Sequence, residues 1–189
     1  MARNASSLAI DTLCNQARKE DIVVAWLYCD YNSQKDQTVI NIMGTVLKRL
    51  VGKRIPDDIH KGFEEGRRPL LPDLMRMLKI AISSLPQVFI FIDALDECLP
   101  KDIPELLGSL KDIIRESPRT RIFLTGRPHV DEVVRRYFTT PVTIPIIPNQ
   151  DDIRNYLEMR LNKDDQPEVM NDDLRAEIVT TILEKMSNT

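Results

Sequence analysis

The feature that most constrains the fold of this chain is a short, unbroken apolar run that ends in carboxylates. Residues Val88 to Ile92 are all apolar, Asp93 follows directly, and Asp96 and Glu97 come shortly after it. Such a run is typical of a strand buried on both faces, as in the parallel sheets of α/β proteins. Acids at the end of that strand lie where open α/β sheets bind ligands. Because three close carboxylates repel one another unless a cation or proton is shared, the run predicts a Mg²⁺ site.

Strand and helix patterns alternate along the chain, which predicts an α/β fold with a parallel sheet covered by helices. We expect Ile22 to Tyr28, Val88 to Ile92 and Ile122 to Thr125 to pair in parallel, with the strand before Asp93 in the centre. Val142 to Ile147 reads as a last strand. Pro145 lacks a backbone N–H, so this strand is expected at an edge.

Helical periodicity and end signals place the helices between these strands. Gly52 is expected to end the helix that begins at Val39, and residues 52–70 to form a loop-rich connection. Asp102 and Glu105 predict a capping box, and Asn149 an N-cap. The expected helices cover approximately residues 6–18, 39–51, 71–85, 102–116, 130–138, 149–161 and 172–187.

Composition limits the class of function. The 189 residues carry a net charge of −3 from 26 basic and 29 acidic residues that are interspersed, so there is no basic surface typical of nucleic-acid binding. The three cysteines, Cys14, Cys29 and Cys98, form no Cys-x-x-Cys pair, which indicates neither a disulfide framework nor a zinc site and suits a reducing compartment. No signal-peptide pattern or membrane-length apolar run is present. We therefore expect a cytoplasmic protein with no nucleic-acid or membrane partner.

Three motifs carry a family resemblance. The segment from Asp93 to Cys98, with its preceding strand, resembles the Walker B segment of NACHT-type P-loop NTPases of the STAND class. Within them it is similar to the nephrocystin-3-like N-terminal domain, common in fungal signalling proteins. Trp26 to Tyr31 resembles that family's second strand, and Arg121 to Pro128 its sensor 1 strand. The motifs occur in the family's order, and the likeness runs from about Ser7 to the C-terminus.

The resemblance implies a three-layer P-loop NTPase-like sandwich and a role for each site residue. Asp93 would help to hold Mg²⁺ bridging the β- and γ-phosphates of ATP or GTP. Asp96 and Glu97 would position or deprotonate the attacking water, with Glu97 the better general base. Arg127, with Thr125 as its hydroxyl partner, would read the terminal phosphate. The alternative is that these residues have only structural roles. Asp93 would then be a cap or loop acid at the strand end, Asp96 and Glu97 would face solvent in a loop, and Gly126 to Pro128 would be a turn.

The Walker A motif of that family does not occur in this sequence. No lysine is followed by Ser or Thr, and the Gly52-Lys53 pair is followed by Arg54. By resemblance the phosphate loop would precede Ser7. We therefore expect the first strand of the fold to be missing, with residues 1–161 a truncated nucleotide-binding domain and 162–189 the start of a helical lid. A gap beside the Ile122 strand is then expected, because Pro145 weakens pairing with the Val142 strand.

The leading hypothesis is a truncated or degenerate NACHT-type nucleotide-binding module of an intracellular signalling protein. The family hydrolyses ATP or GTP, couples binding to oligomerisation and links effector regions to repeats, so protein partners and self-association are expected. We expect no measurable ATPase activity from this chain, since no phosphate loop is present. The alternative is a non-enzymatic protein-interaction scaffold with a vestigial cleft. An unrelated Mg²⁺-dependent hydrolase is disfavoured, because no nucleophile accompanies the acids.

Overall fold

The computed structural model describes residues 2–17, 22–52, 69–146, 149–162 and 171–187. The chain divides into two compact units, Met1–Val142 and Thr143–Thr189, which are taken separately below. Within its described residues, the first unit contains three strands and most of the helices. These are α1 (Ala2–Ala17), β1 (Ile22–Tyr28), α2 (Val39–Val51), α4 (Leu71–Ser83), β2 (Gln87–Asp93), α5 (Ile103–Glu116), β3 (Thr120–Leu124) and α6 (Asp131–Tyr137).

The three strands form one parallel sheet in the order β1-β2-β3. Their register sets Trp26 beside Phe91, and Phe91 beside Phe123. The central position of β2 confirms the prediction from its apolar run, since a strand with neighbours on both sides and layers on both faces leaves no side for solvent. Both crossovers run through helices, as parallel connections require.

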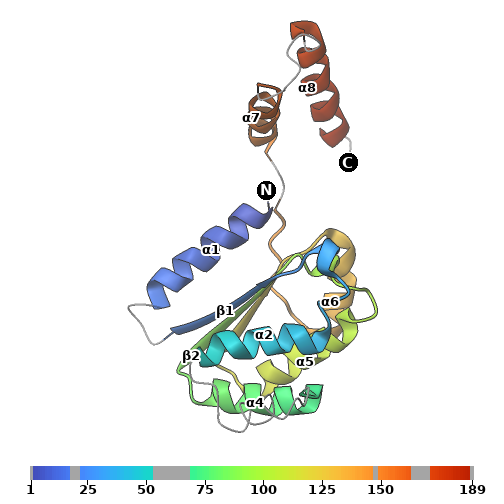
Figure 1. Cartoon of the computed structure of the whole chain (residues 1–189). Coiled ribbons are helices and arrows are strands. Elements are labelled where there is room, and N and C mark those ends of the chain that lie inside the picture. Colours follow the sequence, from blue (N-terminus) through green and yellow to red (C-terminus); the bar gives the residue numbers. More distant parts are fainter. Residues whose placement is uncertain (1, 18–21, 53–68, 147–148, 163–170, 188–189) are drawn as a thin grey trace. The chain divides into compact units, whose positions relative to one another are not determined.

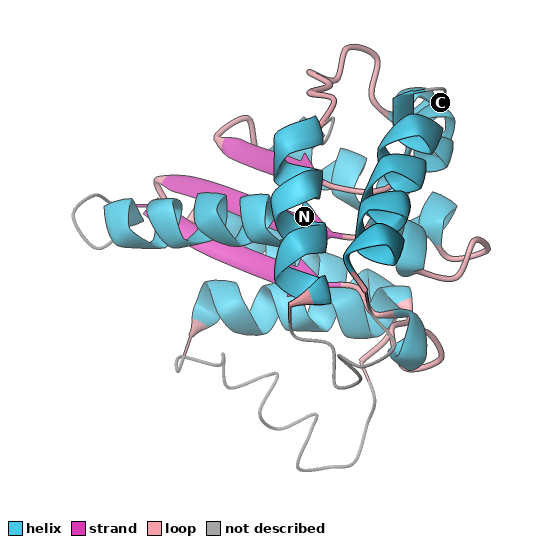
Figure 2. Cartoon of the chain, turned by 90° about the horizontal axis from the view of Figure 1, so that it is seen from above, coloured by secondary structure: helices cyan, strands magenta, loops and turns pink. Residues whose placement is uncertain are grey.

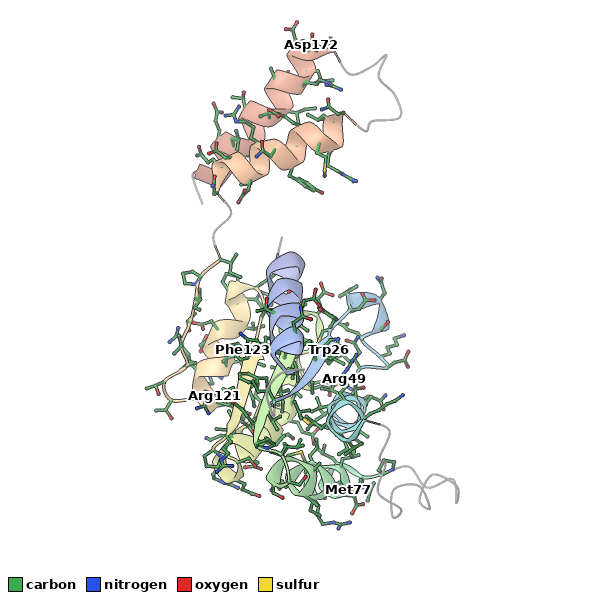
Figure 3. The ribbon with its side chains drawn as sticks, turned by 90° about the vertical axis from the view of Figure 1, so that its left-hand side faces the viewer. Trp26, Arg49, Met77, Arg121, Phe123 and Asp172 are labelled. Carbon is green, nitrogen blue, oxygen red and sulfur yellow. The ribbon has the colours of Figure 1, made fainter. Side chains whose placement is uncertain are left out.

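Helices cover both faces of the sheet (Figures 1 and 2), which gives the expected three layers. The larger core lies on the face of α2, α4 and α5, and it takes Ala25, Val88, Ile90 and Ile92 from the strands. The smaller core lies under α1, where Ile10 packs against Val24 and Phe91. Successive residues along a strand thus face opposite layers of helices, as the pleat of a strand requires. Figure 3 labels Trp26, whose ring lies 3.9 Å from the Arg49 guanidinium of α2.

Helix α2 shows how local sequence sets an element's ends. Most of its apolar residues recur at helical spacing and are buried, and the Thr38 hydroxyl accepts the N–H of Asn41 at 3.3 Å. Gly52 ends the helix with φ 59°, where its N–H donates to the carbonyl of Lys48. Glycine tolerates this left-handed conformation without steric cost. The expectation that Gly52 is a helix cap is therefore confirmed.

Two local predictions are wrong. Residues 142–146 form no strand; Pro145 lacks a donor for a ladder, and Val142 and Ile144 are 92% and 78% exposed. No described strand pairs with the outer side of β3, as expected for the gap. The capping box is also not formed: Asp102 has helical φ and ψ of −93° and −21° and its side chain makes no cap hydrogen bond. A cap needs an extended backbone to aim its oxygen at the first turn.

Residues 53–68, where most of the loop-rich connection was expected, and residue 147 lie outside the described residues. The second unit is a pair of contacting helices, α7 (Gln150–Leu161) and α8 (Asp172–Ser187). Asn149 caps α7 by accepting the N–H of Asp151 at 2.6 Å, as predicted. Arg175 donates to Asn162 and to the carbonyl of Leu161, both at 2.9 Å, which joins the two helices. The compact units divide at residue 142, and the expected lid boundary at residue 161 stays a prediction. None of the described helices combines the length and apolarity that crossing a bilayer requires.

Candidate functional site

The predicted acidic site begins at the carboxyl end of the central strand. Asp93 closes β2 and is only 2% exposed. Ala94 follows with φ 57° and ψ 50°, in the left-handed region, and turns the chain into a short 3₁₀ helix, Leu95–Glu97. A left-handed alanine costs about 1–2 kcal/mol, so the surrounding bonds must enforce this turn.

Thr125 supplies most of those bonds. Its hydroxyl donates to Asp93 Oδ1 at 2.5 Å and accepts the N–H of Ala94 at 2.9 Å. Its backbone N–H donates to the carbonyl of Ile92 at 3.0 Å, and its carbonyl accepts the N–H of Leu95 at 2.8 Å. The structure therefore brings together Asp93 and Thr125, two of the residues predicted from sequence.

Asp96 is bonded to the segment after β3. Its side chain is 8% exposed and accepts the backbone N–H of Arg127 at 3.1 Å, and its carboxylate lies 3.3 Å from Arg127 Nε. The Arg127 side chain is 75% exposed. Gly126 allows this approach, because a Cβ there would lie 2.8 Å from Val130 Cγ2 and 3.4 Å from Asp96 Oδ1. Asp96 and Arg127 thus form a second predicted pair that the fold brings together.

Glu97 is directed to the other neighbour of β2. Its carboxylate accepts the backbone N–H of Tyr31 at 3.0 Å, just beyond the end of β1. Asp30, beside Tyr31, caps the short 3₁₀ helix Tyr31–Ser33 by accepting from Asn32 at 3.2 Å. Asp96 and Glu97 are adjacent in sequence, yet they are bonded to segments on opposite sides of the central strand.

The expectation that the three carboxylates share one cation is therefore wrong. In the described part of the chain, no three acidic, histidine or cysteine side chains are grouped closely enough to hold a metal. Each acid accepts hydrogen bonds from its own donor, which reduces the need for a shared cation. Asp93 still suits Mg²⁺ in another way. Mg²⁺ at nucleotide sites takes one or two carboxylates and completes its shell with phosphates and waters.

Sequence reasoning missed one feature of the site, a pair of buried thiols. Cys29 directly follows β1 and Cys98 directly follows the 3₁₀ turn, and their sulfur atoms lie 3.0 Å apart. The hydrogen bond between the two thiols lowers the pKa of Cys98 below its usual value and raises the pKa of Cys29. The available signal was positional, because both cysteines follow the ends of neighbouring parallel strands.

Comparison with known proteins assigns the chain to a family. Residues 5–127 match the family described as Nephrocystin 3, N-terminal. The chain belongs to this family. The matched stretch includes Asp93, Asp96, Glu97, Thr125 and Arg127, so the whole predicted site lies within it. The family resemblance inferred from the three motifs is confirmed.

One solved structure supports the fold. The chain is similar to the Aeropyrum pernix Orc1 protein, solved in complex with DNA, with a TM-score of 0.53 and 19% identity over 84% of this chain and 40% of that one. A Walker-type ATPase of Pyrococcus abyssi matches with a TM-score of 0.39 and 12% identity over 93% and 65%. The chain thus spans less than two thirds of either. Among curated proteins, none matches it. At 19% identity the likeness to the Orc1 protein shows the fold alone, a parallel α/β sheet covered by helices.

Proposed function

We propose that this nephrocystin 3 N-terminal domain forms the magnesium and terminal-phosphate side of a NACHT-type nucleotide site in a signalling protein. The observation that carries the proposal is the buried carboxylate of Asp93 at the end of the central strand, oriented by the Thr125 hydroxyl at 2.5 Å. Open α/β sheets bind ligands at this edge. The family membership of residues 5–127 supports the same assignment.

Each residue has a separate role in this proposal. Asp93 holds Mg²⁺, which when bound neutralises charge between the phosphates of ATP or GTP. Thr125 keeps the Asp93 carboxylate in one orientation. The Arg127 side chain is exposed, and an exposed ion pair such as that with Asp96 contributes little to the free energy of folding. The guanidinium can therefore leave Asp96 and bind a phosphate at low cost in free energy. The hydrogen bond from the backbone N–H of Arg127 keeps the Asp96 carboxylate in place when the guanidinium binds a phosphate.

Glu97 is the proposed general base. Its carboxylate is held by the Tyr31 N–H at 3.0 Å, which fixes its direction toward the end of β1. A carboxylate oxygen accepts more than one hydrogen bond, so this contact is compatible with accepting a proton from water. The role requires nucleotide and metal to be positioned first.

The affinity expected for residues 1–189 is low. No Gly-x-x-x-x-Gly-Lys-Ser/Thr motif is present in this sequence to hold the phosphates. Charge-assisted hydrogen bonds contribute roughly 1.5–3 kcal/mol each, so three missing ones cost on the order of 5 kcal/mol. Since 1.4 kcal/mol is a factor of ten, a micromolar site becomes about millimolar.

The test is a titration of residues 1–189 with ATP, with and without Mg²⁺, followed by NMR chemical shifts. We expect saturable, Mg²⁺-dependent binding in the millimolar range, centred on residues 93–97 and 125–127, that is lost in Asp93→Asn. The matched control is Asp36→Asn, which removes the same charge from an exposed turn. Binding that Asp93→Asn leaves unchanged would refute the proposed role of Asp93.

The alternative function, a non-enzymatic interaction scaffold, is favoured by one observation. Asp93, Asp96 and Glu97 are each hydrogen-bonded to protein groups without a nucleotide, so the acids have a structural use of their own. In a scaffold the same titration gives no saturable shifts, with or without Mg²⁺. That outcome would replace the nucleotide proposal by the scaffold.

A further inference from the structure

The thiols of Cys29 and Cys98 meet inside the larger core, directly beneath the acidic turn. Their sulfur atoms are 3.0 Å apart, and both residues are 1% exposed. Backbone bonds position them: the Cys29 N–H donates to the carbonyl of Asp93 at 2.9 Å, and the Cys98 N–H to the carbonyl of Leu95 at 3.1 Å. The two residues are 69 positions apart in sequence, so the fold alone creates this contact.

We propose that Cys29 and Cys98 are a redox-active thiol pair, which hydrogen peroxide converts to a disulfide that joins the end of β1 to the turn carrying Asp96 and Glu97. The sulfur atoms are already in contact, and the bond requires them to approach to about 2.05 Å. The inference does not depend on nucleotide binding. It assigns a covalent modification site to two residues with no role in the proposed phosphate chemistry.

The chemistry proceeds in two steps. The Cys98 thiolate attacks one oxygen of hydrogen peroxide, the O–O bond breaks, and Cys98 becomes a sulfenic acid while hydroxide leaves. The sulfur of Cys29 then attacks the sulfenic sulfur, the S–S bond forms and the second hydroxide leaves. With the two thiol protons the products are one disulfide and two waters, so both sulfurs are oxidised and both peroxide oxygens are reduced.

The local contacts favour Cys98 as the attacking sulfur. The thiolate is the reactive form of cysteine. The hydrogen bond with Cys29 holds the pKa of the Cys98 thiol below its ordinary value, although burial opposes this. Cys29, whose sulfur lies 3.0 Å away, is then positioned to attack the sulfenic acid.

Cys14 provides an internal comparison. It is more exposed than either partner and lies on α1, which packs on the opposite face of the sheet, in the smaller core. Oxidation governed by exposure therefore modifies Cys14 first, whereas oxidation governed by proximity links Cys29 and Cys98. The two mechanisms give different products from the same chain.

The experiment uses the unaltered chain. It is treated with hydrogen peroxide, quenched with catalase, denatured, alkylated with iodoacetamide and mapped by mass spectrometry after digestion. We expect a linked peptide pair containing Cys29 and Cys98, two hydrogens lighter than the sum of the free peptides, with Cys14 alkylated. Dithiothreitol should restore three alkylated thiols. Oxidation of Cys14 with Cys29 and Cys98 both recovered as alkylated thiols would overturn the proposal, as would sulfinic acid at Cys98 without a link.

Two variants and a second readout sharpen the result. Cys14→Ala should leave the linked pair unchanged, whereas Cys98→Ala should abolish it and leave Cys29 alkylated; a link between Cys14 and Cys29 in that variant contradicts the assignment. If Cys98→Ala does not fold, the map of the unaltered chain still decides. Amide hydrogen exchange of residues 94–98 should slow after oxidation, because the bond ties their turn to β1. If amide hydrogen exchange of residues 94–98 is unchanged when all molecules carry the disulfide, the bond does not restrain the turn.

Discussion

Thr125 and Asp93 are joined by a 2.5 Å hydrogen bond between the ends of two neighbouring parallel strands. Asp93 is 2% exposed, so water does not replace this donor readily. The same hydroxyl accepts the N–H of Ala94, the residue in the left-handed turn. Thr125 therefore supports both the buried acid and the turn.

The first prediction concerns this bond. Thr125→Val keeps the shape of the side chain but removes the donor to Asp93, and we expect the free energy of unfolding to fall by about 1–3 kcal/mol, because the buried Asp93 carboxylate loses this hydrogen bond. Urea denaturation measures the change. Thr139→Val, at an exposed position, is the control and should stay within about 0.5 kcal/mol of the parent. Equal effects in the two variants would show that the hydroxyl bond contributes nothing.

The second prediction concerns the close packing at Gly126. A Cβ there would lie 2.8 Å from Val130 Cγ2, closer than real contacts allow, so Gly126→Ala should cost about 1–3 kcal/mol. Val130→Ala removes the clashing methyl, and the double variant should be more stable than the sum of the single effects by at least about 0.5 kcal/mol. Gly44→Ala in α2 is the control. Its Cβ meets nothing within 4 Å, so it should stabilise by about 0.5–1 kcal/mol. If the stability changes of Gly126→Ala and Val130→Ala simply add in the double variant, the two side chains do not clash.

The third prediction concerns pH. Lys79 Nζ lies 2.7 Å from Glu116 Oε1 and joins α4 to α5, and this bond lowers the pKa of Glu116 from its ordinary value of 4.5. A lowered pKa in the folded state means that the stabilisation is present above pH 4.5 and is lost as the pH falls through the folded pKa. Lys79→Met should therefore make unfolding less dependent on pH below 4.5. Adding Glu116→Gln to Lys79→Met should change that dependence little. If Lys79→Met leaves the dependence of the unfolding free energy on pH below 4.5 unchanged, the ion pair does not cause that dependence.

The sheet was predictable because its signals are local. Val88 to Ile92 form a continuous apolar run, and that run alone indicates a central strand. The ends of α2 were equally local, since Thr38 and Gly52 act on their own turns. Val142 to Ile147 shows the limit of such reasoning. Its apolar alternation suits a strand, but a strand also needs a partner, and Pro145 offers no donor to one.

The sequence allowed candidate residues to be named, but it did not predict their bonding. The family motifs located Asp96 and Glu97, whereas their partners, Arg127 and Tyr31, come from segments far away in sequence. A cation shared by the three acids was the wrong expectation, because each acid accepts a hydrogen bond from a donor far away in sequence. The Cys29–Cys98 contact was missed for the same reason, since 69 residues separate the two thiols and only the strand order brings them together.

The outer edge of β3 leads to the last prediction. Within the Met1–Val142 unit no described strand pairs with that edge, and Phe123 on it is 44% exposed even though its ring stacks on Phe91 with centroids 4.6 Å apart. An open edge with an exposed aromatic ring is a template for pairing with a second copy. Phe123→Lys places a charge there, so concentration-dependent association should fall, as measured by light scattering.

The same substitution removes the stacked pair, which contributes about 0.5–1.5 kcal/mol, so the stability of Phe123→Lys to urea should also fall. The added charge at the β3 edge and the lost stability have opposite effects on aggregation. The charge lowers association through the edge, whereas a less stable chain aggregates more if aggregation begins from unfolded molecules. Ile80→Lys on α4, where the side chain is 60% exposed away from any strand edge, is the control and should leave association unchanged. If Phe123→Lys associates more as it becomes less stable, association proceeds through unfolding and not through the β3 edge.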